Sequence, residues 1–175
     1  MYQKVKIKDL TPNNIIIENP NDKVDVKYPI KYKFSEYSSS EKFVFQTPKL
    51  IFKEMKKEAG SIFIYASLKR TEACKVFIEK ILDVENLFQE KINTLGNVYN
   101  STEIKEKPVI APCIKFKIKQ QYGKPRINIE NKQGTLTTIY DLKEGNEIIS
   151  NIRFSGLWFF KNWGYFLTLE EMLVL

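Results

Sequence analysis

Hydrophobic and polar residues alternate along most of this chain, which is the pattern of half-buried β-strands. Ile30, Tyr32 and Phe34 alternate with lysines, and Phe43 and Phe45 repeat the pattern shortly afterwards. Further stretches with strand-like composition or alternation lie at residues 61–68, 113–121, 126–130, 134–140, 148–160 and 165–169. The chain is therefore expected to be mainly β.

One segment has helical periodicity instead. Its apolar residues are spaced three or four apart over about six turns. These residues are Phe77, Ile81, Val84, Phe88, Ile92 and Leu95. Thr71 is a suitable N-cap, and Gly96 and Asn97 are typical stop signals. The pattern predicts a helix over residues 71–95, with one apolar face that lies on a sheet.

Strands come before and after this single helix, so the order is not the βαβ repeat of a parallel sheet. A small, strongly bent antiparallel barrel with a helix across one opening fits better, and the OB-fold is a common barrel of this kind. The turn-rich residues 1–27 hold only short apolar pieces and are expected to form an N-terminal arm or extra strands. Residues 28–175 are expected to form the barrel domain.

Composition narrows the chemistry. The 175 residues include no histidine, which removes the common nucleophile pairs, general bases and metal ligands that depend on it. Cys74 and Cys113 fit no zinc spacing, and two buried thiols in a reducing compartment are a simpler interpretation than a disulfide. No apolar run is long enough to span a bilayer. We expect a soluble, intracellular protein that is not an enzyme and needs no cofactor.

Positive charge is concentrated in one part of the chain. The net charge is +7, and residues 105–132 hold eight cations against two acids. Lys115, Lys117 and Lys119 alternate with apolar residues, so on a strand they share one face about 6–7 Å apart, near the phosphate spacing of an extended nucleic acid. Tyr122, Lys124 and Arg126 follow directly. The alternative is a solvated edge strand, on which lysines discourage pairing with other chains.

Aromatic residues favour the first interpretation. The chain has 12 Phe, 9 Tyr and 2 Trp, and several lie next to cations. Examples are the neighbours of Lys31, Lys33 and Lys42, and the run that begins at Trp158. Binding of single strands needs a cationic track for phosphates and flat rings on which bases stack. For any one ring, packing in the core is the simpler alternative.

Four elements occur in a recognisable order. A strand ends in Gln46-Thr47-Pro48, the long helix follows, a proline introduces the basic strand 112–119, and Ile152-Arg-Phe-Ser-Gly-Leu-Trp158 precedes the turn Trp163-Gly164-Tyr165. Over about residues 28–175 this order resembles the single-stranded-DNA-binding proteins of nucleocytoplasmic large DNA viruses, which are related to those of T7-like phages. The resemblance implies an OB-fold with one long helix between the third and fourth barrel strands.

We therefore expect a sequence-independent single-stranded-DNA-binding protein that acts in viral DNA replication, recombination or repair, at the site of viral replication in the host cell. A structural or protein-interaction module, such as a virion component, is the alternative. RNA as a ligand, homo-oligomerisation and replication proteins as partners stay open. The expected binding residues are Lys115, Lys117, Lys119, Tyr122, Lys124, Arg126, Trp158, Lys31, Lys33 and Lys42.

Overall fold

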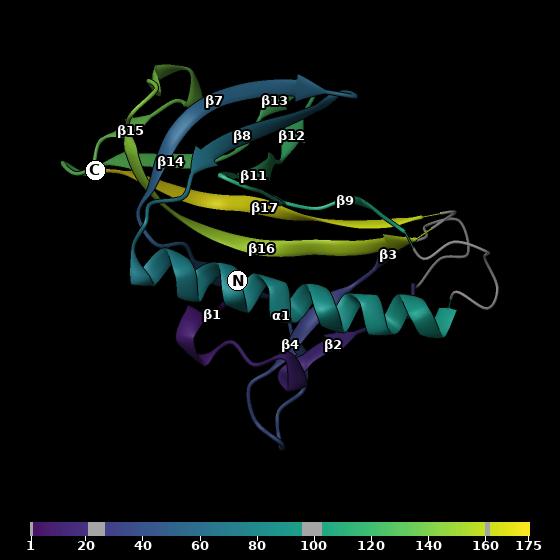
Figure 1. Cartoon of the computed structure of the whole chain (residues 1–175). Coiled ribbons are helices and arrows are strands. Elements are labelled where there is room, and N and C mark those ends of the chain that lie inside the picture. The colour runs from purple at the N-terminus through teal and green to yellow at the C-terminus, as the bar shows by residue number, and fades with distance from the viewer. Residues whose placement is uncertain (1, 21–26, 96–102, 160–161) are drawn as a thin grey trace.

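Five strands form a closed ring in the computed structural model, which describes residues 2–20, 27–95, 103–159 and 162–175 (Figure 1). Each strand of the ring is hydrogen-bonded to two others, so the ring has no open edge. The five strands are β7 (Leu50–Glu58), β8 (Ser61–Ser67), β11 (Cys113–Ile118), β16 (Glu147–Phe159) and β17 (Trp163–Val174).

The ring runs in the order β7–β8–β11–β17–β16 and closes where β16 pairs with β7. This is a small barrel of the OB type, so the predicted fold class is confirmed. The expectation of a wholly antiparallel barrel is wrong at one junction, because β11 and β17 are parallel. The other four junctions are antiparallel.

Helix α1 (Glu72–Leu95) is the long helix that the apolar spacing predicts. The Thr71 hydroxyl accepts a hydrogen bond from the Cys74 amide at 3.2 Å, as expected of an N-cap. The side chains of Phe77, Ile81, Val84, Phe88 and Ile92 are fully buried. The centroid of the Phe88 ring lies 5.0 Å from that of Tyr165 and 5.6 Å from that of Phe154. The helix therefore packs across the β16–β17 hairpin, as Figure 1 shows. The predicted stop signals after it lie outside the described residues.

The position of α1 depends on which strands are counted. Strand β6 (Phe43–Gln46) extends the barrel wall beside β16, and with β6 included the helix lies between the third and fourth wall strands. Within the closed ring alone, the helix follows the second strand, β8.

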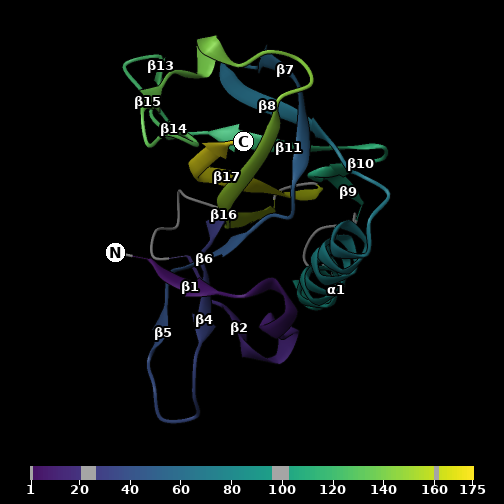
Figure 2. The same ribbon diagram turned by 90° about the vertical axis from the view of Figure 1, so that its left-hand side faces the viewer.

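The N-terminal residues add strands to this barrel. Strand β1 (Gln3–Val5) pairs in parallel with β6, and β2 (Ile15–Ile17) joins β4 (Ile30–Lys33) and β5 (Ser40–Glu41) in a separate sheet. Figure 2 shows this smaller sheet below the barrel, on the side away from β7 and β8. Val5, Leu10 and Ile15 are buried in the same core cluster as the barrel residues. The domain boundary at residue 28 stays a prediction.

Short strands complete the sheets. They are β3 (Lys27–Tyr28), β9 (Ile104–Glu106), β10 (Val109–Ile110), β12 (Gln120–Gln121), β13 (Lys124–Pro125), β14 (Asn128–Asn131) and β15 (Leu136–Thr137). Three-residue 3-10 turns lie at Ile7–Asp9, Pro12–Asn14 and Ile139–Asp141. In the described ranges, α1 lacks the apolar length needed to cross a bilayer.

Candidate nucleic-acid interface

Strand register places cationic and aromatic side chains in one row on the outer face of the barrel. Lys117 on β11 lies opposite Phe63 on β8 and Thr168 on β17, and Thr168 lies opposite Arg153 on β16. Because side chains alternate between faces of a strand, the neighbours Phe116 and Ile118 point into the core, where they are fully buried. Lys117 and Arg153 are thus two strands, or about 10 Å, apart.

Two hollows meet at the Arg153 end of this row. The first, of about 190 Å³, contains Lys117, Trp158 and Phe166, and the second, also of about 190 Å³, contains Lys31 and Lys42. Both hollows are lined by Lys27, Arg153, Ser155 and Gly156. We call the two together the basic groove. Its cations are Lys27, Lys31, Lys42, Lys117, Lys119 and Arg153, and its exposed or half-buried rings are Tyr28, Trp158 and Phe166.

The rings of the groove are held by their neighbours. Phe166 packs on Phe63 with ring centroids 5.7 Å apart, and the Lys117 ammonium lies 4.6 Å from the Phe166 centroid. Trp158 lies across Gly164 of the facing strand, where an added Cβ would come within 2.6 Å of the indole Cζ2. The absence of a side chain at Gly164 therefore gives the Trp158 ring its position beside the groove.

Lys117 is the member of the lysine strand that is available to an anion. Within the described part of the chain, no carboxylate lies within ion-pair distance of its ammonium. Partial burial, followed by repulsion from Lys27, holds the pKa of Lys117 below its ordinary value, while Glu106 acts weakly in the other direction. A phosphate in the groove would favour the charged form of Lys117 and so offset both effects.

Lys115 does not face solvent, so the expectation of three outward ammonium groups is wrong at this residue. It is only 7% exposed, and its Nζ lies 3.1 Å from Glu106 and 3.6 Å from Glu58. It also lies 4.7 Å from the centroid of the Phe63 ring. The reason is β9, which pairs with β17 and brings Glu106 onto this face. The charge of Lys115 is thus balanced within the chain.

Lys119 lines the groove but shares a carboxylate with Arg153. Its Nζ lies 2.5 Å from one oxygen of Glu170, whose other oxygen accepts a hydrogen bond from Arg153 Nε. The Glu170 side chain is 11% exposed. The Tyr2 ring covers both cations, with its centroid 5.4 Å from Lys119 Nζ and 5.7 Å from the Arg153 guanidinium carbon. This end of the groove is therefore partly neutralised and partly covered by the N-terminal strand.

The other predicted residues are distributed as follows. Lys31 and Lys42 line the groove, and Lys31 is also paired with Glu18 at 2.9 Å. Lys33 is half-buried on β4 and lines neither hollow. Tyr122, Lys124 and Arg126 also line neither hollow.

The β12–β13 hairpin, where those three residues lie, follows directly in the chain after Lys119 of the groove. Strands β12 and β13 pair directly after Lys119, whose carbonyl accepts a hydrogen bond from the Arg126 amide at 2.7 Å. Tyr122 is 94% exposed at the hairpin tip, and Lys124 and Arg126 are exposed as well. In the described ranges, none of these three side chains has an ion pair, hydrogen bond or ring contact. The hairpin thus presents two cations and a ring to solvent.

Lys27, Arg153 and Phe166 line the groove but are not among the residues predicted from the sequence. Arg153 lies inside the quoted Ile152–Trp158 motif, and Phe166 alternates with the buried Tyr165 and Leu167. Alternation alone places both on the outer face. Their meeting with Lys117 depends on the pairing of β11 with β17, which no local pattern encodes.

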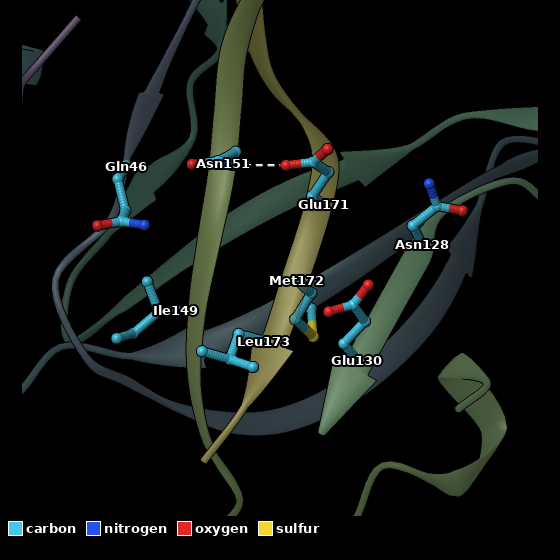
Figure 3. Close-up of a pocket in the computed structure, with 8 residues that line it drawn as sticks. All are labelled: Gln46, Asn128, Glu130, Ile149, Asn151, Glu171, Met172 and Leu173. Carbon is cyan, nitrogen blue, oxygen red and sulfur yellow. Dashed lines mark hydrogen bonds between the residues drawn. The ribbon is translucent and has the colours of Figure 1, made fainter. Parts of the chain in front are cut away.

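An acidic hollow lies farther along the β16–β17 hairpin. It has a volume of about 260 Å³, and Glu130 and Glu171 line it together with Asn128 and Asn151 (Figure 3). The Asn151 amide donates a hydrogen bond to Glu171 at 2.7 Å, and Figure 3 shows these side chains turned toward one another from adjacent strands. Its two carboxylates would repel a phosphate, so the anion-attracting surface ends near Glu170.

Comparison with known proteins gives a structural match. No family model matches the sequence, and no curated protein does. The crystal structure of gp2.5, a single-stranded DNA binding protein encoded by bacteriophage T7, aligns with a TM-score of 0.56 and 8% identity over 75% of this chain and 91% of that chain. A C-terminally truncated single-stranded DNA-binding protein from bacteriophage Enc34 aligns with a TM-score of 0.43 and 11% identity over 94% and 96%. This chain therefore shares its fold with the T7 protein.

Proposed function

We propose that this chain binds single-stranded DNA without sequence preference, in the basic groove and along the β12–β13 hairpin. We further propose that it acts in viral DNA replication, recombination or repair inside the host cell. The fold likeness to a phage protein of that activity supports the first part. The motif order, which resembles that of the single-stranded-DNA-binding proteins of nucleocytoplasmic large DNA viruses, supports the second.

One observation carries the proposal: the two hollows join cations from three separate parts of the chain around accessible rings. Lys31 and Lys42 come from the N-terminal third, Lys117 from the middle and Arg153 from the C-terminal hairpin, next to Trp158. A groove that tracks phosphates with cations and stacks bases on rings is how single strands are bound without sequence readout. Groove and hairpin together extend well beyond one nucleotide.

The chemistry of the groove favours a single strand over a duplex. Trp158 and Phe166 offer ring faces, which unpaired bases can stack on and paired bases cannot reach. No described helix lies on this face to enter a major groove, because α1 packs beneath the β16–β17 hairpin. Phosphates would meet Lys117 and Lys27, whose mutual repulsion an anion relieves.

The proposal is tested by fluorescence anisotropy with labelled oligo-dT, the matched duplex and oligo-U at several salt concentrations. We expect oligo-dT to bind more tightly than the duplex. If about four phosphates are neutralised, its affinity should fall with salt with a log–log slope of roughly −3. Equal affinity for the duplex, or binding that hardly responds to salt, would contradict the proposal and favour a protein-interaction module. The oligo-U arm shows whether RNA competes.

A further inference from the structure

A fourth hollow lies apart from the basic groove, beside the first turns of α1. It has a volume of about 610 Å³ and is bounded by residues 4–8, by residues 45–48 at and after the end of β6, by Glu72, Ala73 and Val76 of α1, and by Asn151 of β16. We call it the arm cleft. None of its lining residues lines the basic groove. In Figure 1 the first turns of α1 lie at the left, whereas β3, which carries Lys27 of the groove, lies at the right.

The floor of the arm cleft is aliphatic. Val5 is buried, Ile7, Pro48 and Val76 are half-buried, and Ala73 is exposed. The only ring in the lining, that of Phe45, is 1% exposed and packs in the core, so no base could stack on it. An apolar side chain would fill such a floor, and a nucleic acid would find no ring face there.

The rim of the arm cleft is positively charged. Lys4, Lys6 and Lys8 are all exposed, and within the described residues none of them forms an ion pair. Glu72 is the single acid in the lining. The cleft also lies at the N-terminal end of α1, where the helix dipole favours negative charge. The arm that forms this rim is fixed to the helix, because Lys80 Nζ donates a hydrogen bond to the Leu10 carbonyl at 3.0 Å.

We propose that the arm cleft binds an acidic peptide segment of a partner protein, which places an apolar side chain on the aliphatic floor and carboxylates against Lys4, Lys6 and Lys8. Charge complementarity selects this occupant, since a basic or purely apolar segment would leave the three ammonium groups unpaired. Because the cleft and the basic groove share no lining residue, the peptide and single-stranded DNA bind at the same time. The proposal does not depend on the proposed function.

The test is a titration with a short labelled peptide of Asp, Glu and Ser that carries two leucines, read by anisotropy and by amide shifts in NMR spectra of the full chain. We expect saturable binding that shifts the amides of Val5, Ile7 and Val76. A peptide with Ser in place of Leu, and one with Lys in place of the acids, should each bind at least roughly tenfold more weakly. No binding of the acidic, leucine-containing peptide would overturn the proposal.

Two variants and one control separate the arm cleft from the groove. K4E/K6E/K8E should weaken the peptide at least roughly tenfold, whereas the charge-matched control K57E/K132E/K143E should change its affinity less than about twofold. A73Q places a larger neutral side chain on the floor while keeping a good helix former, and should weaken the peptide several-fold. Oligo-dT saturation should leave peptide affinity unchanged.

Other occupants give distinct results that would overturn the assignment. Stronger loss of oligo-dT affinity than of peptide affinity in K4E/K6E/K8E would mean that the cleft holds nucleic acid. A dimer in sedimentation that A73Q dissociates would mean that a second copy of the chain covers it. Binding to vesicles with anionic lipids that K4E/K6E/K8E abolishes, without peptide binding, would mean a membrane surface.

Discussion

Glu170 is the carboxylate that pairs with two cations of the basic groove. Its two oxygens contact Lys119 and Arg153, over which the Tyr2 ring lies, and its side chain is 11% exposed. A carboxylate held in this way reduces the positive charge that the groove offers to DNA. It also offsets the repulsion between two cations in the protein without DNA. We therefore regard Glu170 as an internal counterion that limits the affinity of the groove.

We predict that E170Q binds oligo-dT more tightly, by roughly threefold to tenfold at low salt, because Lys119 and Arg153 become available to phosphates. The salt slope should become steeper by about 0.7 to 1.4, as one or two more phosphates are neutralised. The matched control is E171Q, which removes the same charge one residue away, where the carboxylate accepts from Asn151 and pairs with no described cation. Equal effects of the two variants would contradict the role of Glu170.

The pKa of Lys117 gives a second prediction for one residue. Its pKa is lowered in the protein without DNA, chiefly by burial and then by Lys27, and a bound phosphate favours the charged form. Binding therefore takes up a proton in the pH range between the two pKa values. Oligo-dT affinity should fall as pH rises through that range, and the decline should begin below the ordinary lysine pKa of about 10.4.

The control for this pH dependence is K117R, because a guanidinium stays charged throughout the range. K117R should retain the affinity seen at neutral pH and lose the early decline. Oligo-dT titrations at a series of pH values and constant ionic strength measure both properties. An unchanged decline in K117R would show that another group is responsible.

Among the secondary-structure elements, the β12–β13 hairpin is the best test of the sequence-based site. Y122A removes an exposed ring, and K124A/R126A removes two exposed cations. We predict that Y122A weakens oligo-dT binding by about 1–3 kcal/mol if the ring stacks on a base. K124A/R126A should reduce the salt slope by about 1.4, at two phosphates. The melting temperature should stay the same, because all three side chains are exposed.

A matched control for the hairpin is K132A/K143A, which removes two exposed lysines that line neither the groove nor the arm cleft. This control should leave the salt slope unchanged. If the hairpin variant behaves like the control, bound DNA does not reach beyond Lys119.

The secondary-structure elements also show which parts of the fold can be predicted from the local pattern of apolar and polar residues. Helix α1 was predictable because its apolar spacing continues without a break from Phe77 to Ile92. Strand β7 was not predicted, because an irregularity between Phe52 and Glu54 interrupts the alternation and its second half is mostly charged. A bulge shifts which side chains face inward, so a simple period of two fails there.

The candidate site was predictable only in part, for a related reason. Alternation along β11 gave Lys117 and Lys119 their common face. The burial of Lys115 depends on Glu106 and Glu58, which reach it from β9 and β7. The contribution of Arg153 depends on the pairing of β16 with β17 and of β17 with β11. Contacts between distant strands of this kind are set by the register of the whole barrel, and a short stretch of sequence does not contain that information.

At the scale of the whole molecule, charge is divided among faces. Cations gather in the basic groove, on the β12–β13 hairpin and at the rim of the arm cleft, while Glu130 and Glu171 line a hollow that shares Gln46 and Asn151 with the arm cleft. A strand of DNA drawn to the groove is therefore kept from the acidic end of the β16–β17 hairpin. If DNA occupies the basic groove as proposed, the arm cleft stays accessible, because the two share no lining residue.

The measurement that tests the central claim most directly is the salt dependence of oligo-dT affinity in the variant K27A/K42A/K117A. This variant removes three groove cations, one from β3, one from the residue before β6 and one from β11. Its control, K57A/K132A/K143A, removes the same charge from exposed positions that line none of these hollows. We predict that the groove variant loses about two units of slope and at least roughly tenfold in affinity, whereas the control retains the original slope. Equal slopes in the two variants would contradict the assignment of the basic groove as the DNA site.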